Sequence, residues 1–182
     1  GVEEGYQALN KGDYNAALSV FEPLAAQGDA GAQAALASMY YDGIGVKKDA
    51  KKAVGLAQEA ANKRQMIAQY ILYHAYQFGN GVEKDGKKSF NWLSLSAEKG
   101  YPPAQLAIAQ IYFYDKDYYR SLTWAQLAAK HDVPNAFTLI GNHYALGTGV
   151  KQDDAQAVSW YKKAAMKGDA EAQYWLGEMY YT

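Results

Sequence analysis

Apolar residues recur along this chain at helical spacing, inside a longer period of 36 or 32 residues. The first clear stretch places Ala32, Leu36 and Tyr40 four residues apart. The same stripe returns as Ala68, Leu72 and Tyr76; Ala104, Ile108 and Tyr112; Ala136, Ile140 and Tyr144; and Ala172, Leu176 and Tyr180. Positions i, i+4 and i+8 share one face of a helix, so each stripe predicts a helix with its tyrosine in the core. The fixed period predicts a stacked helical repeat.

Each stripe is followed by the signals of a turn and a second helix. Three copies carry Gly-x-Gly-Val, at 43–46, 79–82 and 147–150. Glycine reaches positive φ without a Cβ clash, so the first glycine can end a helix. The aspartates that come next are predicted N-caps of the second helices: Asp49, Asp85, Asp117 and Asp153. Those second helices share a large residue at one register: Leu56, Trp92, Trp124 and Trp160.

The organisation predicted from this period is one array of about eleven helices spanning 1–182. Its units are 1–29, 30–65, 66–101, 102–133, 134–169 and a half unit at 170–182. The pattern Ala-Gln-x-x-Leu-Gly-x-x-Tyr, Gly-x-Gly-Val, Asp, then Ala-x-x-Trp-Tyr-x-Lys-Ala-Ala-x-x-Gly-Asp resembles the Sel1-like repeat family, relatives of tetratricopeptide repeats. The resemblance covers 30–182 closely and 1–29 more loosely. It implies an all-α fold, a right-handed α-α superhelix (solenoid) that binds other proteins in a groove lined by the first helix of each pair.

The composition of the chain limits the classes of partner that it is expected to bind. Apolar residues make up 49% and charged residues 20% of the 182 residues, and the net charge is −1. Because the chain has no block of basic residues, it lacks the cationic surface that is typical of nucleic-acid-binding proteins. The longest stretch without Asp, Glu, Lys or Arg, 133–150, contains Pro134, Asn135, Asn142 and His143, so no membrane span is expected. The absence of cysteine removes disulfides and thiolate chemistry together.

The register also predicts which side chains would line a groove. On first helices, residues off the packing stripe would face a bound protein or peptide. The predicted groove residues are Ser38, Tyr41, Tyr70, His74, Gln77, Phe78, Gln110, Phe113, Tyr114, Thr138, Asn142, Tyr174, Glu178 and Tyr181. Ala34, Leu106, Asn135, Leu146 and Glu171 belong to the same register. Aromatic residues are enriched at binding hot spots. The competing interpretation is that these rings only fill gaps between helices.

Catalytic signals are weak. Ser-x-x-Lys occurs at 96–99 and 159–162, but Ser-Asp-Asn and Lys-Thr-Gly, its companions in penicillin-recognising enzymes, are absent. No histidine pair has metal-ligand spacing, and no cofactor is expected. The sequence therefore favours a non-enzymatic interaction scaffold or adaptor. Two alternatives stay open: a cell-wall glycan binder, whose Tyr70 and Tyr114 would stack on sugars, and a β-lactam-binding enzyme using Ser96 or Ser159.

The two ends of the sequence bear on how the last helix is covered and on where the protein is located. The half unit 170–182 is apolar around most of its circumference, so we expect it to continue into more chain, or to pack on a partner or a second copy. The stretch 3–14 resembles the opening of bacterial Sel1-like proteins that follow a signal peptide. A periplasmic or secreted location is expected on that basis.

Overall fold

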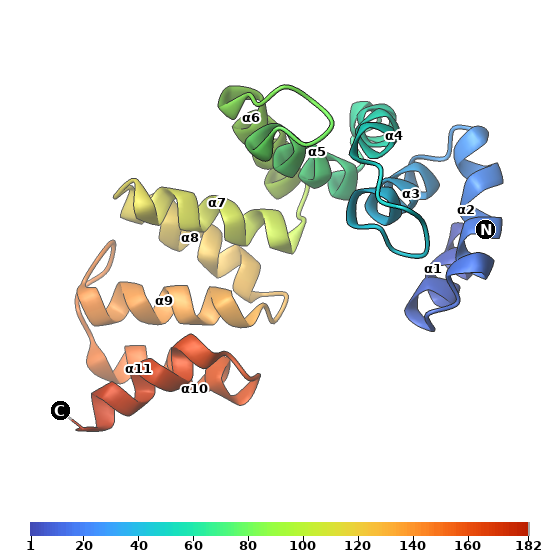
Figure 1. Ribbon diagram of the computed structural model, residues 1–182. Helices are drawn as coiled ribbons and strands as arrows, with labels where there is room; N and C mark the ends of the chain where they lie inside the picture. Colours follow the sequence, from blue (N-terminus) through green and yellow to red (C-terminus); the bar gives the residue numbers. More distant parts are fainter. Residues whose placement is uncertain (182) are drawn as a thin grey trace. The chain divides into compact units, whose positions relative to one another are not determined.

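The computed structural model describes residues 1–181, which form eleven α-helices and no strand (Figure 1). The helices are α1 (Val2–Asn10), α2 (Tyr14–Ala26), α3 (Ala30–Asp42), α4 (Ala50–Asn62), α5 (Met66–Phe78), α6 (Gly86–Glu98), α7 (Pro102–Tyr114), α8 (Tyr118–Ala129), α9 (Pro134–Leu146), α10 (Asp154–Met166) and α11 (Ala170–Tyr181). The all-α fold of paired helices is therefore confirmed. No helix within residues 1–181 is long and apolar enough to cross a membrane.

The chain forms two compact units, Gly1–Tyr101 with α1–α6 and Pro102–Thr182 with α7–α11. In the first unit α3 packs against α4 and α5 against α6, and the first helices α3 and α5 also contact each other. In the second unit α7 packs against α8 and α9 against α10, and the first helices α7 and α9 touch. Each unit is thus a stack of helix pairs whose first helices lie side by side, the arrangement of a solenoid.

Aspartates begin the second helices, as the sequence predicts. The carboxylate of Asp49 accepts a hydrogen bond from the backbone N–H of Lys52 at 3.0 Å. Asp13, Asp85, Asp117 and Asp153 cap α2, α6, α8 and α10 in the same way. Each such cap satisfies an otherwise unpaired N–H and is worth about 1 kcal/mol. The helix-ending glycines Gly43, Gly79 and Gly147 are all left-handed, with φ of 71°, 69° and 68°.

Two of the second helices are followed by a left-handed residue that is not glycine, which the sequence does not predict. Gly28, Gly100 and Gly168 end three of them with positive φ. Arg64 and Asp132 occupy the same slot, and their φ values are 65° and 56°. A residue with a Cβ pays a steric cost in this conformation. The repeat geometry therefore imposes the left-handed turn even where glycine is missing.

The stripe tyrosines differ from the core residues that the sequence predicts. Tyr40, Tyr76, Tyr112 and Tyr144 are half-buried. Three of these rings lie near a cation: Tyr40 with Lys52 at 4.3 Å, Tyr76 with Lys88 at 5.5 Å and Tyr112 with Arg120 at 5.7 Å. The core assignment of Tyr180 is wrong, since this residue is 64% exposed. In the described chain no helix after α11 covers it.

Candidate functional site

In the first unit an aromatic strip runs along α5. Tyr70, His74 and Phe78 lie four residues apart; the first two rings meet edge to face at 4.7 Å and the last two stack at 6.1 Å. Tyr101, in the turn after α6, packs edge-on against Tyr70 at 5.2 Å. Phe78 is 62% exposed. The aromatic strip, defined as these four residues, presents contiguous ring surface, and Tyr101 is the member that sequence reasoning missed.

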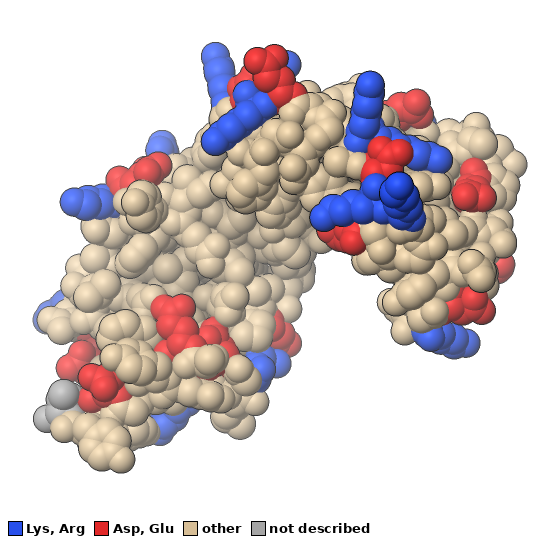
Figure 2. Space-filling view, viewed as in Figure 1, with Lys and Arg blue, Asp and Glu red and all other residues tan. Residues whose placement is uncertain are grey.

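The aromatic strip is uncharged. Burial, with smaller effects of Tyr73 and Tyr101, raises the pKa of Tyr70 to about 12. Burial also lowers the pKa of His74, against the opposing pull of Asp42, so its imidazole is neutral at pH 7. Helix α5 contains no Lys, Arg, Asp or Glu. Figure 2 instead shows lysine and arginine side chains projecting over α4 and α6, the second helices of this unit.

The other predicted residues of the first unit lie on α3 and α5. Ser38, Tyr41 and Gln77 are half-buried. Asn80 donates a hydrogen bond from Nδ2 to the Tyr41 hydroxyl at 3.2 Å, which connects the turn after α5 to α3. Ala34, in contrast, is fully buried in the core that α3 shares with α5. Its predicted exposure is wrong because the neighbouring first helix covers it.

In the second unit most predicted residues are accessible. Gln110, Tyr114, Tyr174, Glu178 and Tyr181 are exposed, with Tyr114 at 88%. Phe113 is half-buried and packs edge-on against Tyr118 and His143, at 5.5 and 5.1 Å. These side chains are dispersed over α7 and α11, and no aromatic contact that joins the two helices is seen among the described residues. The second unit therefore offers separate exposed rings.

Two predicted residues on α9 are already engaged. Thr138 is only 2% exposed, and its hydroxyl donates to the Asp169 carboxylate at 2.7 Å. The prediction that Thr138 is open to a ligand is wrong, because the residue before α11 closes over it. Asn142 is half-buried, and its Oδ1 accepts a hydrogen bond from the Tyr161 hydroxyl at 2.6 Å.

A serine–histidine contact that the sequence did not predict lies inside the second unit. The Oγ of Ser121 is 3.0 Å from Nε2 of His143, and both residues are fully buried. His143 Nδ1 is 2.7 Å from the Thr148 carbonyl oxygen, which only accepts, so Nδ1 carries the proton. The single hydroxyl hydrogen of Ser121 is shared between two acceptors, Nε2 and the Ala109 carbonyl oxygen at 2.8 Å. Ser89 makes the same serine-to-carbonyl bond one pair earlier in the repeat register, so the contact is structural.

The burial of His143 predicts a pH-dependent stability. Burial lowers the pKa of His143 below its usual 6.5, against a raising effect of the Thr148 backbone. The unfolded chain therefore takes up the proton first, and the free energy of unfolding falls as the pH drops through 6.5 toward the lower folded-state pKa. Urea unfolding of wild type and His143→Gln between pH 8 and 5.5 measures this. Wild type should lose more stability than the variant; parallel curves would exclude His143 as the cause.

The sequence's catalytic candidates do not assemble a site. Ser96 is fully buried and donates to the Met66 carbonyl at 2.8 Å, whereas Ser159 is exposed on α10. Within residues 1–181, no group of three or more His, Asp or Glu side chains is arranged to hold a metal ion.

Comparison with known proteins places the array in a family. The profile of the Sel1 repeat matches residues 30–64, 67–101, 102–133, 138–169 and 170–182. The chain belongs to the Sel1 repeat family. Sel1 repeats generally serve as scaffolds for protein–protein interaction, which fits helix pairs whose first helices carry few charges.

Bacterial Sel1 proteins share the fold over nearly the whole chain. A crystal structure of a Sel1 repeat protein from Oxalobacter formigenes is 38% identical, covers 99% of this chain and 75% of its own, and has a TM-score of 0.87. A protective antigen from uropathogenic Escherichia coli is 30% identical over 100% of this chain and 44% of its own, with a TM-score of 0.82. An uncharacterised protein from Neisseria meningitidis is 36% identical over 88% of this chain, which spans 34% of that relative's length.

Proposed function

We propose that this Sel1 array is a non-enzymatic scaffold that binds a segment of another protein on the aromatic strip of α5. The supporting observation is the strip itself: Tyr70, His74 and Phe78 in ring contact along one helix, with Phe78 62% exposed at its end. Aromatic side chains supply large contact area at low conformational-entropy cost, and they are enriched at hot spots.

The chemistry of the strip favours a neutral, apolar-anchored segment. The neutral His74 and the protonated Tyr70 add hydrogen-bonding groups without charge. Tyr41 and Asn80, which are hydrogen-bonded to each other in the same unit, keep a hydroxyl hydrogen and an amide oxygen that can bond a peptide backbone. The exposed rings of the second unit, Tyr114 among them, are proposed as additional contacts for the same class of partner.

Photo-crosslinking at position 78 tests this proposal. A benzophenone amino acid replaces Phe78 in one variant and Tyr119, an exposed tyrosine on α8, in a matched control. We expect one protein to crosslink at 78 and not at 119. In the purified complex, Phe78→Ala should weaken binding by about 2 kcal/mol, roughly thirtyfold, because a hot-spot ring is lost.

Other outcomes would refute it. Equal crosslinking at both positions would remove α5 as the binding face. Retention on insoluble peptidoglycan that is lost in Tyr70→Ala and Tyr114→Ala, with no protein crosslinked, would establish the glycan-binding alternative. Covalent labelling of Ser96 or Ser159 by a penicillin-type probe would establish the enzymatic one. Circular dichroism of each variant confirms that the fold is intact.

A further inference from the structure

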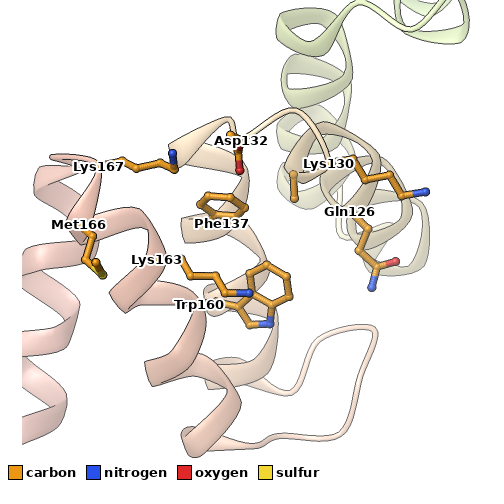
Figure 3. Close-up of a pocket in the computed structure, with 9 residues that line it drawn as sticks. Gln126, Lys130, Asp132, Phe137, Trp160, Lys163, Met166 and Lys167 are labelled. Atoms are coloured by element: carbon orange, nitrogen blue, oxygen red, sulfur yellow. The ribbon is translucent and has the colours of Figure 1, made fainter.

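A cavity lies where α8, α9 and α10 of the second unit meet, and none of the predicted groove residues lines it. Figure 3 shows its walls: Gln126 from α8, Lys130 and Asp132 from the following turn, Phe137 from α9, and Trp160 and Lys163 from α10. Ala129, Met166 and Lys167 complete the lining, and the volume is about 720 Å³. We call it the tryptophan pocket. Its size suits one or two side chains of a ligand rather than a whole helix.

The floor of the tryptophan pocket is aromatic. Phe137 is 5% exposed, and its ring centroid lies 5.9 Å from that of Trp160. Nζ of Lys163 sits 4.3 Å from the Trp160 ring centroid, so a cation–π contact holds this lysine at the mouth. An aromatic or long aliphatic side chain that enters the pocket would meet ring surface below and an ammonium group beside it.

The rim of the tryptophan pocket is cationic. Lys130, Lys163 and Lys167 surround it, against the one carboxylate of Asp132. None of the three lysines forms an ion pair with a carboxylate in residues 1–181. Opposite charges a few ångströms apart attract even where water screens them, so a ligand with carboxylates beside its apolar group complements this rim.

The first unit contains the same cavity with a different rim. Ala61 and Trp92 occupy the positions of Ala129 and Trp160, in a cavity of about 450 Å³. There Gln69 replaces the phenylalanine, and Leu95 and Asn62 stand in place of Lys163 and Lys130. Arg64, Glu98 and Lys99 complete the lining of the cavity in the first unit, so its rim carries two cations and one carboxylate. The repeat itself therefore explains the hollow, whereas the pairing of Phe137 with Trp160 and the lysines at positions 130 and 163 distinguish the cavity of the second unit.

From these observations we infer that the tryptophan pocket binds an acidic peptide segment, in which one aromatic side chain enters the pocket and flanking carboxylates contact the lysines. A nucleic acid would need a row of cations that follows its backbone, and the chain has a net charge of −1. The proposal concerns a pocket of the second unit and is independent of the binding function proposed for α5.

Nuclear magnetic resonance with defined peptides tests this inference. The probe is the acetylated and amidated peptide Glu-Glu-Trp-Glu-Glu, unlabelled, titrated into ¹⁵N-labelled full chain. We expect a saturable shift of the Trp160 indole N–H resonance, assigned by Trp160→Phe. Replacing the tryptophan of the peptide by alanine should weaken binding, and 1 M salt should weaken it further because screening shortens to about 3 Å.

A matched pair of variants isolates the rim. Lys130→Asn/Lys163→Leu installs the residues that the equivalent cavity of the first unit carries, so the fold should tolerate them. This variant should raise the dissociation constant about tenfold, through loss of two favourable charges. The control, Lys151→Asn/Lys162→Leu, changes the net charge equally. Lys151 and Lys162 are exposed but do not line the pocket.

Several outcomes of these titrations would contradict the inference. No saturable shift of Trp160, equal weakening by the control, or equal binding of Lys-Lys-Trp-Lys-Lys would overturn the inference. Equal or tighter binding of a ten-nucleotide oligothymidine would replace it with a nucleic-acid site. Phe78→Ala should leave peptide binding unchanged, so failure of this site and failure of the α5 site are told apart.

Discussion

Replacing Phe21 with alanine should lower the free energy of unfolding of the first unit by about 3–5 kcal/mol, the usual cost of emptying a buried aromatic site. Phe21 is completely buried in the cluster that joins α2 to α3. Its ring contacts Tyr6 edge to face at 5.3 Å, and Gly5 lies directly against it. Urea denaturation followed by circular dichroism measures the loss.

Hydrogen exchange should localise this effect. In a repeat array each pair is held by its neighbours, so the weakened end opens before the rest. Amides of α1 and α2 should exchange faster in Phe21→Ala while those of α9 and α10 change little. Tyr119→Ala is the control: this side chain is 78% exposed, and its removal should change stability by less than about 0.5 kcal/mol. A loss below 1 kcal/mol in Phe21→Ala would contradict the prediction.

Gly81→Ala should destabilise the first unit by about 2–4 kcal/mol, although it adds a single methyl group. Gly81 has φ of +76°, a region that costs residues with a Cβ about 1–2 kcal/mol. An added Cβ would also lie 2.5 Å from the carbonyl oxygen of Ala50, the first residue of α4. Because that neighbour is backbone, relief requires α4 and the turn after α5 to separate.

The same substitution at Gly55 should have the opposite sign. Gly55 lies in the interior of α4, and a Cβ there would meet no atom within 4 Å. Alanine is better than glycine in a helix by about 0.5–1 kcal/mol, so Gly55→Ala should stabilise the unit by that amount. Thermal and urea unfolding of both variants decide the matter. Similar effects at the two positions would refute the close-approach argument for Gly81.

Periodicity predicted most of the architecture, because it records local constraints that every copy repeats. The aspartate caps, the left-handed glycines and the pairing of helices all act within one unit of the repeat. Side-chain burial was predicted less well, since it depends on residues distant in sequence. Thr138 is covered by Asp169, 31 residues later, and Tyr180 is exposed because no described helix follows α11 to cover it.

The two candidate sites likewise combine residues that the sequence predicted with residues that it did not predict. The α5 members of the aromatic strip follow helical spacing and were predicted, but Tyr101 sits in a turn, where no period applies. The tryptophan pocket draws its walls from three helices, and a pattern read one helix at a time does not reveal such a cavity. The sequence did contain one indication of the tryptophan pocket: Phe137 occupies the position at which the other copies have Gln33, Gln69, Gln105 and Gln173.

The paired cavities at Trp92 and Trp160 carry an evolutionary consequence. Because each hollow forms between the end of one helix pair and the pair that follows, duplication of a gene segment that encodes one pair creates another hollow beside the new tryptophan. The rim side chains are exposed and contribute little to stacking, so they are free to diverge while the scaffold stays constant. A lineage of such proteins can therefore acquire new recognition chemistry through a handful of surface mutations in a spare copy, without risking the ancestral one.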